Sequence, residues 1–118
     1  GASRIGHGIH SLRDPALVEY LAKHRIGLEV NITSNIHTGI VDEYVNHPAR
    51  EIFDKGLLAN LNTDDPAISG IDLPHEYEKA ARAAGLTAEM TRQSQLNALE
   101  MAFLSPDEKK ELLNKKKT

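Results

Sequence analysis

Three short apolar segments, each followed by helix-forming sequence, set the strongest constraint on how this chain folds. They cover residues 4–8, 27–32 and 57–63. Each predicts a β-strand, because apolar residues are bounded by turn-forming Gly, Asn or Asp. Three consecutive βα units imply an α/β fold with a parallel sheet and right-handed crossovers. We expect residues 1–118 to form a single structural unit, with surplus helices at the C-terminal end.

Capping residues predict where the helices begin and end. Asp14 and Pro15 suit the start of the first helix, and Gly27 is placed to terminate it. A loop is expected over residues 33–39. Further helices are expected over residues 48–55, 73–84 and 88–103, and after the capping box Ser105-Pro106-Asp107-Glu108. The lysines at 115–117 would complement the last helix dipole or form a solvated tail.

Composition narrows the range of partners and compartments. A net charge of −3 gives no basic face for nucleic acid, and no apolar segment approaches the ~18 residues of a membrane span. The sequence has no cysteine, which excludes a disulfide framework and a thiolate zinc site and fits a reducing, cytoplasmic location. The start has no signal-peptide pattern.

The length of 118 residues is well below the ~200–250 residues of a complete (β/α)₈ barrel. The first residue is Gly1, and strand-like sequence follows almost at once. We therefore expect a chain cut from something larger.

Polar side chains follow each predicted strand, at the edge where parallel sheets bind their ligands. His7 lies between two glycines, which allow close approach of a ligand or of neighbouring backbone, although such a histidine is more often a structural hydrogen-bonding residue. Asp64 and Asp65 precede Pro66. They fit ordinary turn chemistry, and equally a metal-binding carboxylate beside a substrate-binding one.

Other polar residues give weaker indications. Glu29 and Asn31 alternate with apolar neighbours, which fits either a polar barrel lumen or an ordinary polar strand face. No glycine-rich phosphate loop and no serine nucleophile elbow is present. The remaining histidines are expected in loops, helix caps or on the surface, without a ligand role: His10, His24, His37, His47 and His75.

Taken together, these motifs resemble the C-terminal part of the adenosine deaminase family, most of all its bacterial-type members. They follow the family's order along essentially the whole chain. The matching segments are Arg4-Ile5-Gly6-His7-Gly8-Ile9-His10, Leu28-Glu29-Val30, Thr33-Ser34-Asn35, Thr38-Gly39, His47-Pro48, Leu61-Asn62-Thr63-Asp64-Asp65-Pro66-Ala67-Ile68-Ser69-Gly70, Glu76-Tyr77, Gly85-Leu86-Thr87, Asn97-Ala98-Leu99 and Ala102-Phe103-Leu104.

The resemblance implies strands six to eight of a (β/α)₈ TIM barrel, hence a partial barrel, in a zinc-dependent hydrolase. Such enzymes convert adenosine and deoxyadenosine to inosine and deoxyinosine and release ammonia. By this resemblance Asp64 is a zinc ligand and Asp65 hydrogen-bonds the imidazole nitrogen of the purine. His7 is the catalytic histidine that orients and supports the zinc-bound hydroxide.

Two family motifs are absent from the chain: the His-x-His pair of the first strand, and the His-Ala-Gly-Glu motif with the third zinc histidine and the proton donor. One hypothesis is therefore the C-terminal part of an adenosine deaminase, inactive without the missing N-terminal barrel portion. The alternative is a non-catalytic barrel fragment, isolated or engineered, that self-associates through open edges of its first and third strands. Within the enzyme class, adenine deaminase is a further alternative.

Overall fold

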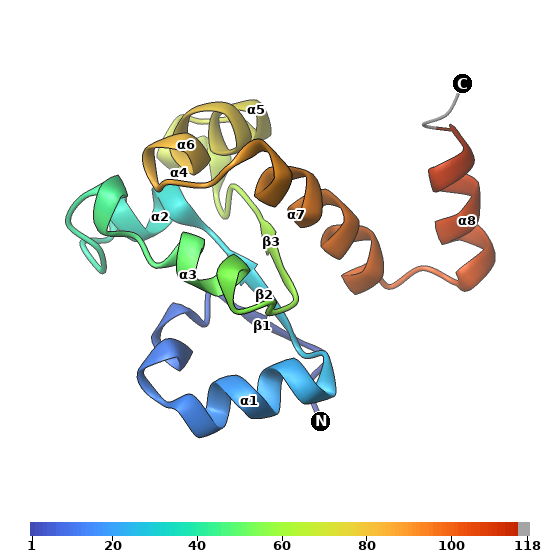
Figure 1. The fold of residues 1–118 in the computed structure, drawn as a ribbon. Helices are drawn as coiled ribbons and strands as arrows, with labels where there is room; N and C mark the ends of the chain where they lie inside the picture. Colours follow the sequence, from blue (N-terminus) through green and yellow to red (C-terminus); the bar gives the residue numbers. More distant parts are fainter. Residues whose placement is uncertain (116–118) are drawn as a thin grey trace.

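A computed structural model describes residues 1–115 of the chain, and its centre is a three-stranded parallel sheet (Figure 1). The strands are β1 (Arg4–Gly6), β2 (Gly27–Val30) and β3 (Ala59–Leu61), in the spatial order β1-β2-β3. In register, Ile5 pairs with Leu28 and Val30 with Leu61. The predicted α/β fold with three βα units is confirmed. All three strands are shorter than predicted, so His7 and Asp64 lie just beyond strand ends.

The helices follow the predicted order with several differences in extent. Their bounds are η1 (Ile9–Arg13), α1 (Pro15–His24), α2 (Ile32–His37), η2 (Tyr44–Asn46), α3 (Ala49–Asp54), α4 (Pro66–Ser69), α5 (Leu73–His75), the π-helical η3 (Glu76–Ala80), α6 (Ala81–Ala83), α7 (Ala88–Met101) and α8 (Pro106–Lys115). The loop predicted over residues 33–39 is wrong, because α2 occupies most of it. Of the predicted basic end at 115–117, only Lys115 lies within the described residues, where it pairs with Glu111.

Most predicted helix starts are confirmed by their capping bonds. The Asp14 carboxylate accepts from the backbone of Ala16 and Leu17 at the start of α1. Thr87 caps α7 in the same way, and Ser105 forms the predicted capping box with Glu108.

The predicted role of Gly27 as a helix terminator is wrong. α1 ends at His24, and its C-cap residue Arg25 takes the left-handed conformation itself (φ 51°). Gly27 instead begins β2, where a Cβ atom would lie 2.5 Å from the Cε of Met101. Close packing against α7 therefore explains this glycine.

The core lies on one face of the sheet. Leu28, Val30 and Ala59 are completely buried there, together with Leu21 of α1 and Ile52 of α3. The opposite face is more polar and carries Glu29 of β2, with Asn60 in β3 and Asn62 just beyond it. This two-faced pattern is typical of barrel strands whose outer face is covered by helices.

Within residues 1–115, β3 is an edge strand of the sheet, as predicted, and α7 packs along its outer edge. The Ser94 hydroxyl accepts from the backbone N–H of Leu61 at 2.9 Å. The Asn97 amide donates to the carbonyl of Ala59 at 2.7 Å. Figure 1 shows α7 running beside β3, with α8 further out. Across residues 1–115, no helix is both long and apolar enough to cross a membrane.

Candidate active site

His7 and Asp64 both follow the carboxyl end of a strand, His7 directly after β1 and Asp64 three residues after β3. The backbone N–H of His7 donates to the carbonyl of Glu29 at 2.9 Å, which continues the β1–β2 pairing by one residue. Both residues have positive φ angles, 59° for His7 and 62° for Asp64. Non-glycine residues rarely adopt this conformation, and they concentrate at functional sites. The unusual backbone turns both side chains towards each other across the sheet edge.

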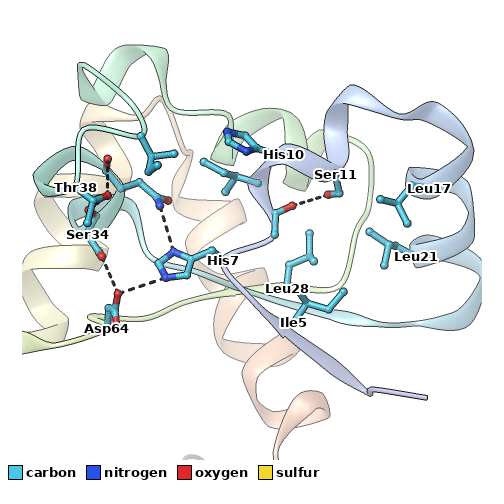
Figure 2. A pocket seen from close by; sticks show the side chains of 14 residues that line it. Ile5, His7, His10, Ser11, Leu17, Leu21, Leu28, Ser34, Thr38 and Asp64 are labelled. Atoms are coloured by element: carbon cyan, nitrogen blue, oxygen red, sulfur yellow. Dashed lines mark hydrogen bonds and ion pairs between the residues drawn. The ribbon is translucent and has the colours of Figure 1, made fainter.

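The two side chains are in polar contact. His7 Nε2 lies 3.4 Å from Asp64 Oδ2, and both side chains are a little over two-fifths exposed. The Ser34 hydroxyl at the start of α2 donates to the same carboxylate oxygen at 2.7 Å. Figure 2 shows this arrangement, with His7 between Asp64 and the apolar side chains of the neighbouring groove. Asp64 is thus oriented from two sides.

Two asparagine amides face the other nitrogen of the His7 ring. Asn31 Nδ2 and Asn35 Nδ2 each lie 3.2 Å from His7 Nδ1. Asn31 Nδ2 also donates to the carbonyl of Glu29 at 3.0 Å. Asn31 therefore belongs to the site, whereas Glu29 itself pairs with Arg4 at 3.2 Å.

His47 lies in a loop, as predicted, and is the C-cap residue of η2, but the structure also buries it. It is buried, with 4% of its area exposed. Its Nε2 lies 2.9 Å from Asn35 Oδ1, and its Nδ1 accepts from the backbone N–H of Ala49 at 3.0 Å. Burial lowers the pKa of His47 from 6.5 to about 4, so the ring is neutral near pH 7.

Sequence reasoning placed Glu76 in a matching segment but gave no role to this carboxylate, which is completely buried. Its two oxygens accept from the backbone N–H and the hydroxyl of Thr33, at 2.9 and 2.8 Å. Burial raises the pKa of Glu76, against the effect of these hydrogen bonds. Glu76 ties the start of α2, and so Ser34 and Asn35, to the helical region after residue 72.

Asp65 lies next to Asp64 but in a different environment. Its side chain caps α4 by accepting from the backbone N–H of Ile68 at 3.2 Å, and it is exposed. Among the described residues, those lining the cavities beside His7 include Asp64 but not Asp65. The structure therefore brings together two of the three predicted site residues.

Two cavities meet at His7 and Asp64. A polar cavity of about 530 Å³ lies on the polar face of the sheet and includes Glu29, Asn31 and Asn62 in its lining. A larger groove of about 770 Å³ extends along β1, with Ile5 and Leu17 in its apolar part. Figure 2 shows this groove, with polar residues at one end and apolar residues at the other.

A zinc ion would find an incomplete ligand set in this chain. Catalytic zinc needs about three protein ligands and one open position. Within residues 1–115, no group of three His, Cys, Asp or Glu side chains is arranged to hold a metal ion. Asp64 with His7 nearby can supply part of such a site, and the other ligands would have to come from outside these residues.

Sequence comparison identifies one family. The sequence profile of the family described as adenosine deaminase matches residues 1–118. The chain is 56% identical over 115 residues to an adenosine deaminase of Vibrio cholerae, and 53% identical over 116 residues to one of Edwardsiella ictaluri. These alignments cover 98% of this chain but only 34% and 35% of the relatives. The chain thus spans about a third of the curated relatives it matches, their C-terminal portion.

Solved structures show the same fold. An adenine deaminase from Arthrobacter aurescens superposes with a TM-score of 0.88 at 28% identity, over 95% of this chain and 34% of that one. An amidohydrolase from Burkholderia ambifaria, solved with bound Zn, superposes with a TM-score of 0.80 at 26% identity, over 91% of this chain and 30% of that one. The match to these larger proteins confirms that the three βα units form a partial barrel.

Proposed function

The chain belongs to the adenosine deaminase family, and we propose that it is the C-terminal part of a zinc-dependent enzyme that deaminates adenosine and deoxyadenosine. The products are inosine or deoxyinosine and ammonia, and the reaction belongs to the complete barrel. We assign the enzyme to the cytoplasm, with which the cysteine-free sequence is compatible. The observation that carries the proposal is the contact between His7 Nε2 and Asp64 Oδ2 at the carboxyl ends of β1 and β3.

In this proposal each site residue has a separate role. Asp64 is one zinc ligand, and Ser34 orients its carboxylate through the 2.7 Å hydrogen bond. His7 orients and electrostatically supports the attacking hydroxide from the opposite side. Asp65 hydrogen-bonds the imidazole nitrogen of the purine, which requires its carboxylate to turn away from the α4 cap. Zinc, when bound, lowers the pKa of a bound water to ~7.

The proposed partner is the N-terminal barrel portion of the longer enzyme, docking at β1. Within residues 1–115, β1 is an edge strand of the sheet. Ser3 O and His7 N bond to β2, so by alternation the backbone groups of Arg4 and Gly6 face outward. Ile5 and Leu17 are 38% and 39% exposed in the groove beside this edge. A strand followed by a helix would satisfy the backbone groups and bury the apolar side chains.

Closing the barrel also requires a strand at β3, where α7 would have to give way, whereas docking at β1 needs no such change. Ser94 and Asn97 of α7 already hydrogen-bond the outer edge of β3. A second copy of the chain is the competing occupant of β1. Sedimentation velocity over a range of concentrations measures that competition, and a tight homodimer that excludes the N-terminal portion would overturn the proposed partner.

Complementation tests the proposed activity. The chain is mixed with a separately expressed N-terminal portion of the Vibrio cholerae relative, and the loss of the ultraviolet absorbance of adenosine is followed. We expect turnover and bound zinc only in the mixture. Asp64→Ala should abolish both, whereas Asp65→Ala should retain zinc and impair substrate use. Unchanged zinc and rate in the Asp64→Ala mixture would refute the ligand assignment.

The same assay separates the alternatives. Zinc binding and turnover by the chain alone would exclude the non-catalytic, self-associating alternative, and would also contradict our proposal that the missing portion is needed. Adenine deaminase is favoured by the structural match to the Arthrobacter aurescens enzyme, at 28% identity. The identity of 56% to adenosine deaminases favours the nucleoside. The ratio of the rates with adenosine and adenine decides between the two substrates.

A further inference from the structure

We propose that His47 and Asn35 are positioning residues that hold the His7 ring in one tautomer, with the proton on Nε2 facing Asp64. The inference rests on the proposed function only in giving His7 a catalytic role. The hydrogen bonds that carry it belong to the chain itself, and they link the end of β1 to the start of α3 through two side chains.

The first fixed point is the backbone N–H of Ala49, which can only donate. It lies 3.0 Å from His47 Nδ1, so that nitrogen must be the acceptor. The buried His47 ring is neutral near pH 7, because burial lowers its pKa to about 4. Its single proton therefore resides on Nε2, which donates to Asn35 Oδ1 at 2.9 Å.

This bond fixes the orientation of the Asn35 amide. Because Asn35 Oδ1 faces His47, the NH₂ group faces His7 and can only donate to Nδ1, at 3.2 Å. Without His47, the amide could rotate by half a turn and present its oxygen to His7 instead. His47 thus determines which group of Asn35 meets His7, although it does not contact His7 itself.

The hydrogen bond of Asn31 to the Glu29 carbonyl independently indicates the same tautomer of His7. The carbonyl of Glu29 can only accept, and it accepts from Asn31 Nδ2 at 3.0 Å. The same NH₂ group lies 3.2 Å from His7 Nδ1. Two amide donors therefore converge on Nδ1, which must be the acceptor nitrogen of the ring.

The consequence is a directed His7 ring. Its Nε2–H points towards Asp64 Oδ2, at 3.4 Å. A donor held beside this carboxylate can orient an oxygen nucleophile that lies within hydrogen-bond reach of both groups. In the opposite tautomer, the Nδ1–H of His7 would face two N–H donors. The lone pair of Nε2 would then face the carboxylate of Asp64. The hydrogen bonds from His47 through Asn35 therefore fix the tautomer of His7 before substrate binds.

Nitrogen-15 NMR of the 118-residue chain with labelled histidine tests the proposal without any turnover. At about pH 8, above the ordinary histidine pKa of ~6.5, neutral rings reveal their tautomer through long-range proton–nitrogen correlations. We expect pyrrole-type Nε2 and pyridine-type Nδ1 signals for both His7 and His47. A pyrrole-type Nδ1 in either ring would overturn the proposal, and failure of the complementation assay would not affect this result.

Variants then test the hydrogen bonds that join His47, Asn35 and His7 one at a time. Asn35→Asp keeps an acceptor for His47 but replaces one of the two donors at His7 Nδ1 by an acceptor, so a protonated Nδ1 should become detectable in His7. His47→Phe frees the Asn35 amide, so a fraction of His7 with the proton on Nδ1 should appear beside the form that Asn31 still favours. Asn114→Asp adds the same charge on α8 and should leave His7 unchanged. A wild-type signature of His7 in both Asn35→Asp and His47→Phe would refute a positioning role, and the wild-type spectrum decides even where a variant fails to fold.

Discussion

The buried His47 is expected to make the folded chain less stable in mild acid. In the folded state burial lowers its pKa from 6.5 to about 4. In the unfolded state the ring regains its ordinary pKa and takes up a proton as the pH falls below 6.5. The unfolded state therefore binds more protons between pH 6.5 and about 4, and the free energy of unfolding decreases as the pH falls through this window.

The size of the effect follows from the pKa difference. One pKa unit corresponds to ~1.4 kcal/mol, so the full shift corresponds to ~3 kcal/mol. This loss is complete near pH 4 and does not grow further below it, because both states are then protonated. The free energy of unfolding of a domain is normally about 5–15 kcal/mol. With a typical value of ~10 kcal/mol, the loss is a large part of the total stability.

Urea unfolding followed by circular dichroism, at several pH values for the wild type and for His47→Phe, isolates this contribution. The phenylalanine ring of the variant cannot titrate, so the difference in unfolding free energy between the two proteins should shrink by ~3 kcal/mol as the pH falls to about 4. Other titrating groups cancel in the difference, including Glu76, whose pKa burial raises. A difference that stays constant with pH would refute a buried, neutral His47.

Three further variants test other contacts. Ser94→Ala leaves the backbone N–H of Leu61 without its acceptor and should cost about 1–3 kcal/mol in urea unfolding, so an unchanged midpoint would contradict a stabilising contact of α7 with the edge of β3. Gly27→Ala places a Cβ against Met101 and should cost about 1–3 kcal/mol in the wild type but not in a Met101→Ala background; an equal cost in that background would point to another cause. Asp65→Ala removes the α4 cap and should lower the free energy of unfolding by about 0.5–2 kcal/mol. The complemented enzyme should keep zinc and show a raised KM for adenosine. An unchanged KM would contradict a place for Asp65 in the substrate site.

The sequence predicted those parts of the fold that depend on neighbouring residues. The Asp14 cap and the capping box at Ser105 are local hydrogen bonds, and both form as expected. The parallel βα order also predicted that His7 and Asp64 meet, because parallel strands end at a common edge. Local capping signals and the direction of the strands were therefore sufficient to predict that His7 and Asp64 lie together.

The supporting residues could not be predicted in the same way, because their partners are distant in the sequence. His47 pairs with Asn35 twelve residues earlier, and Glu76 with Thr33 at a separation of 43. A histidine before a proline carries no local sign of burial, and a glutamate in an Ala- and Glu-rich helix suggests an exposed face. Asn97 likewise has no local feature that points to the edge of β3. Only the packing of α2, α3 and α7 on the sheet gives these side chains their partners.

Our central claim is that this chain holds an incomplete zinc site, which the N-terminal barrel portion completes. Measuring the zinc content tests this claim most directly. Elemental analysis is made on the purified chain, on its mixture with the N-terminal portion of the Vibrio cholerae relative, and on the same mixture with Asp64→Ala. The account predicts no stoichiometric zinc in the first sample, one zinc per complex in the second and none in the third. Stoichiometric zinc in the chain alone, or in the Asp64→Ala complex, would contradict it.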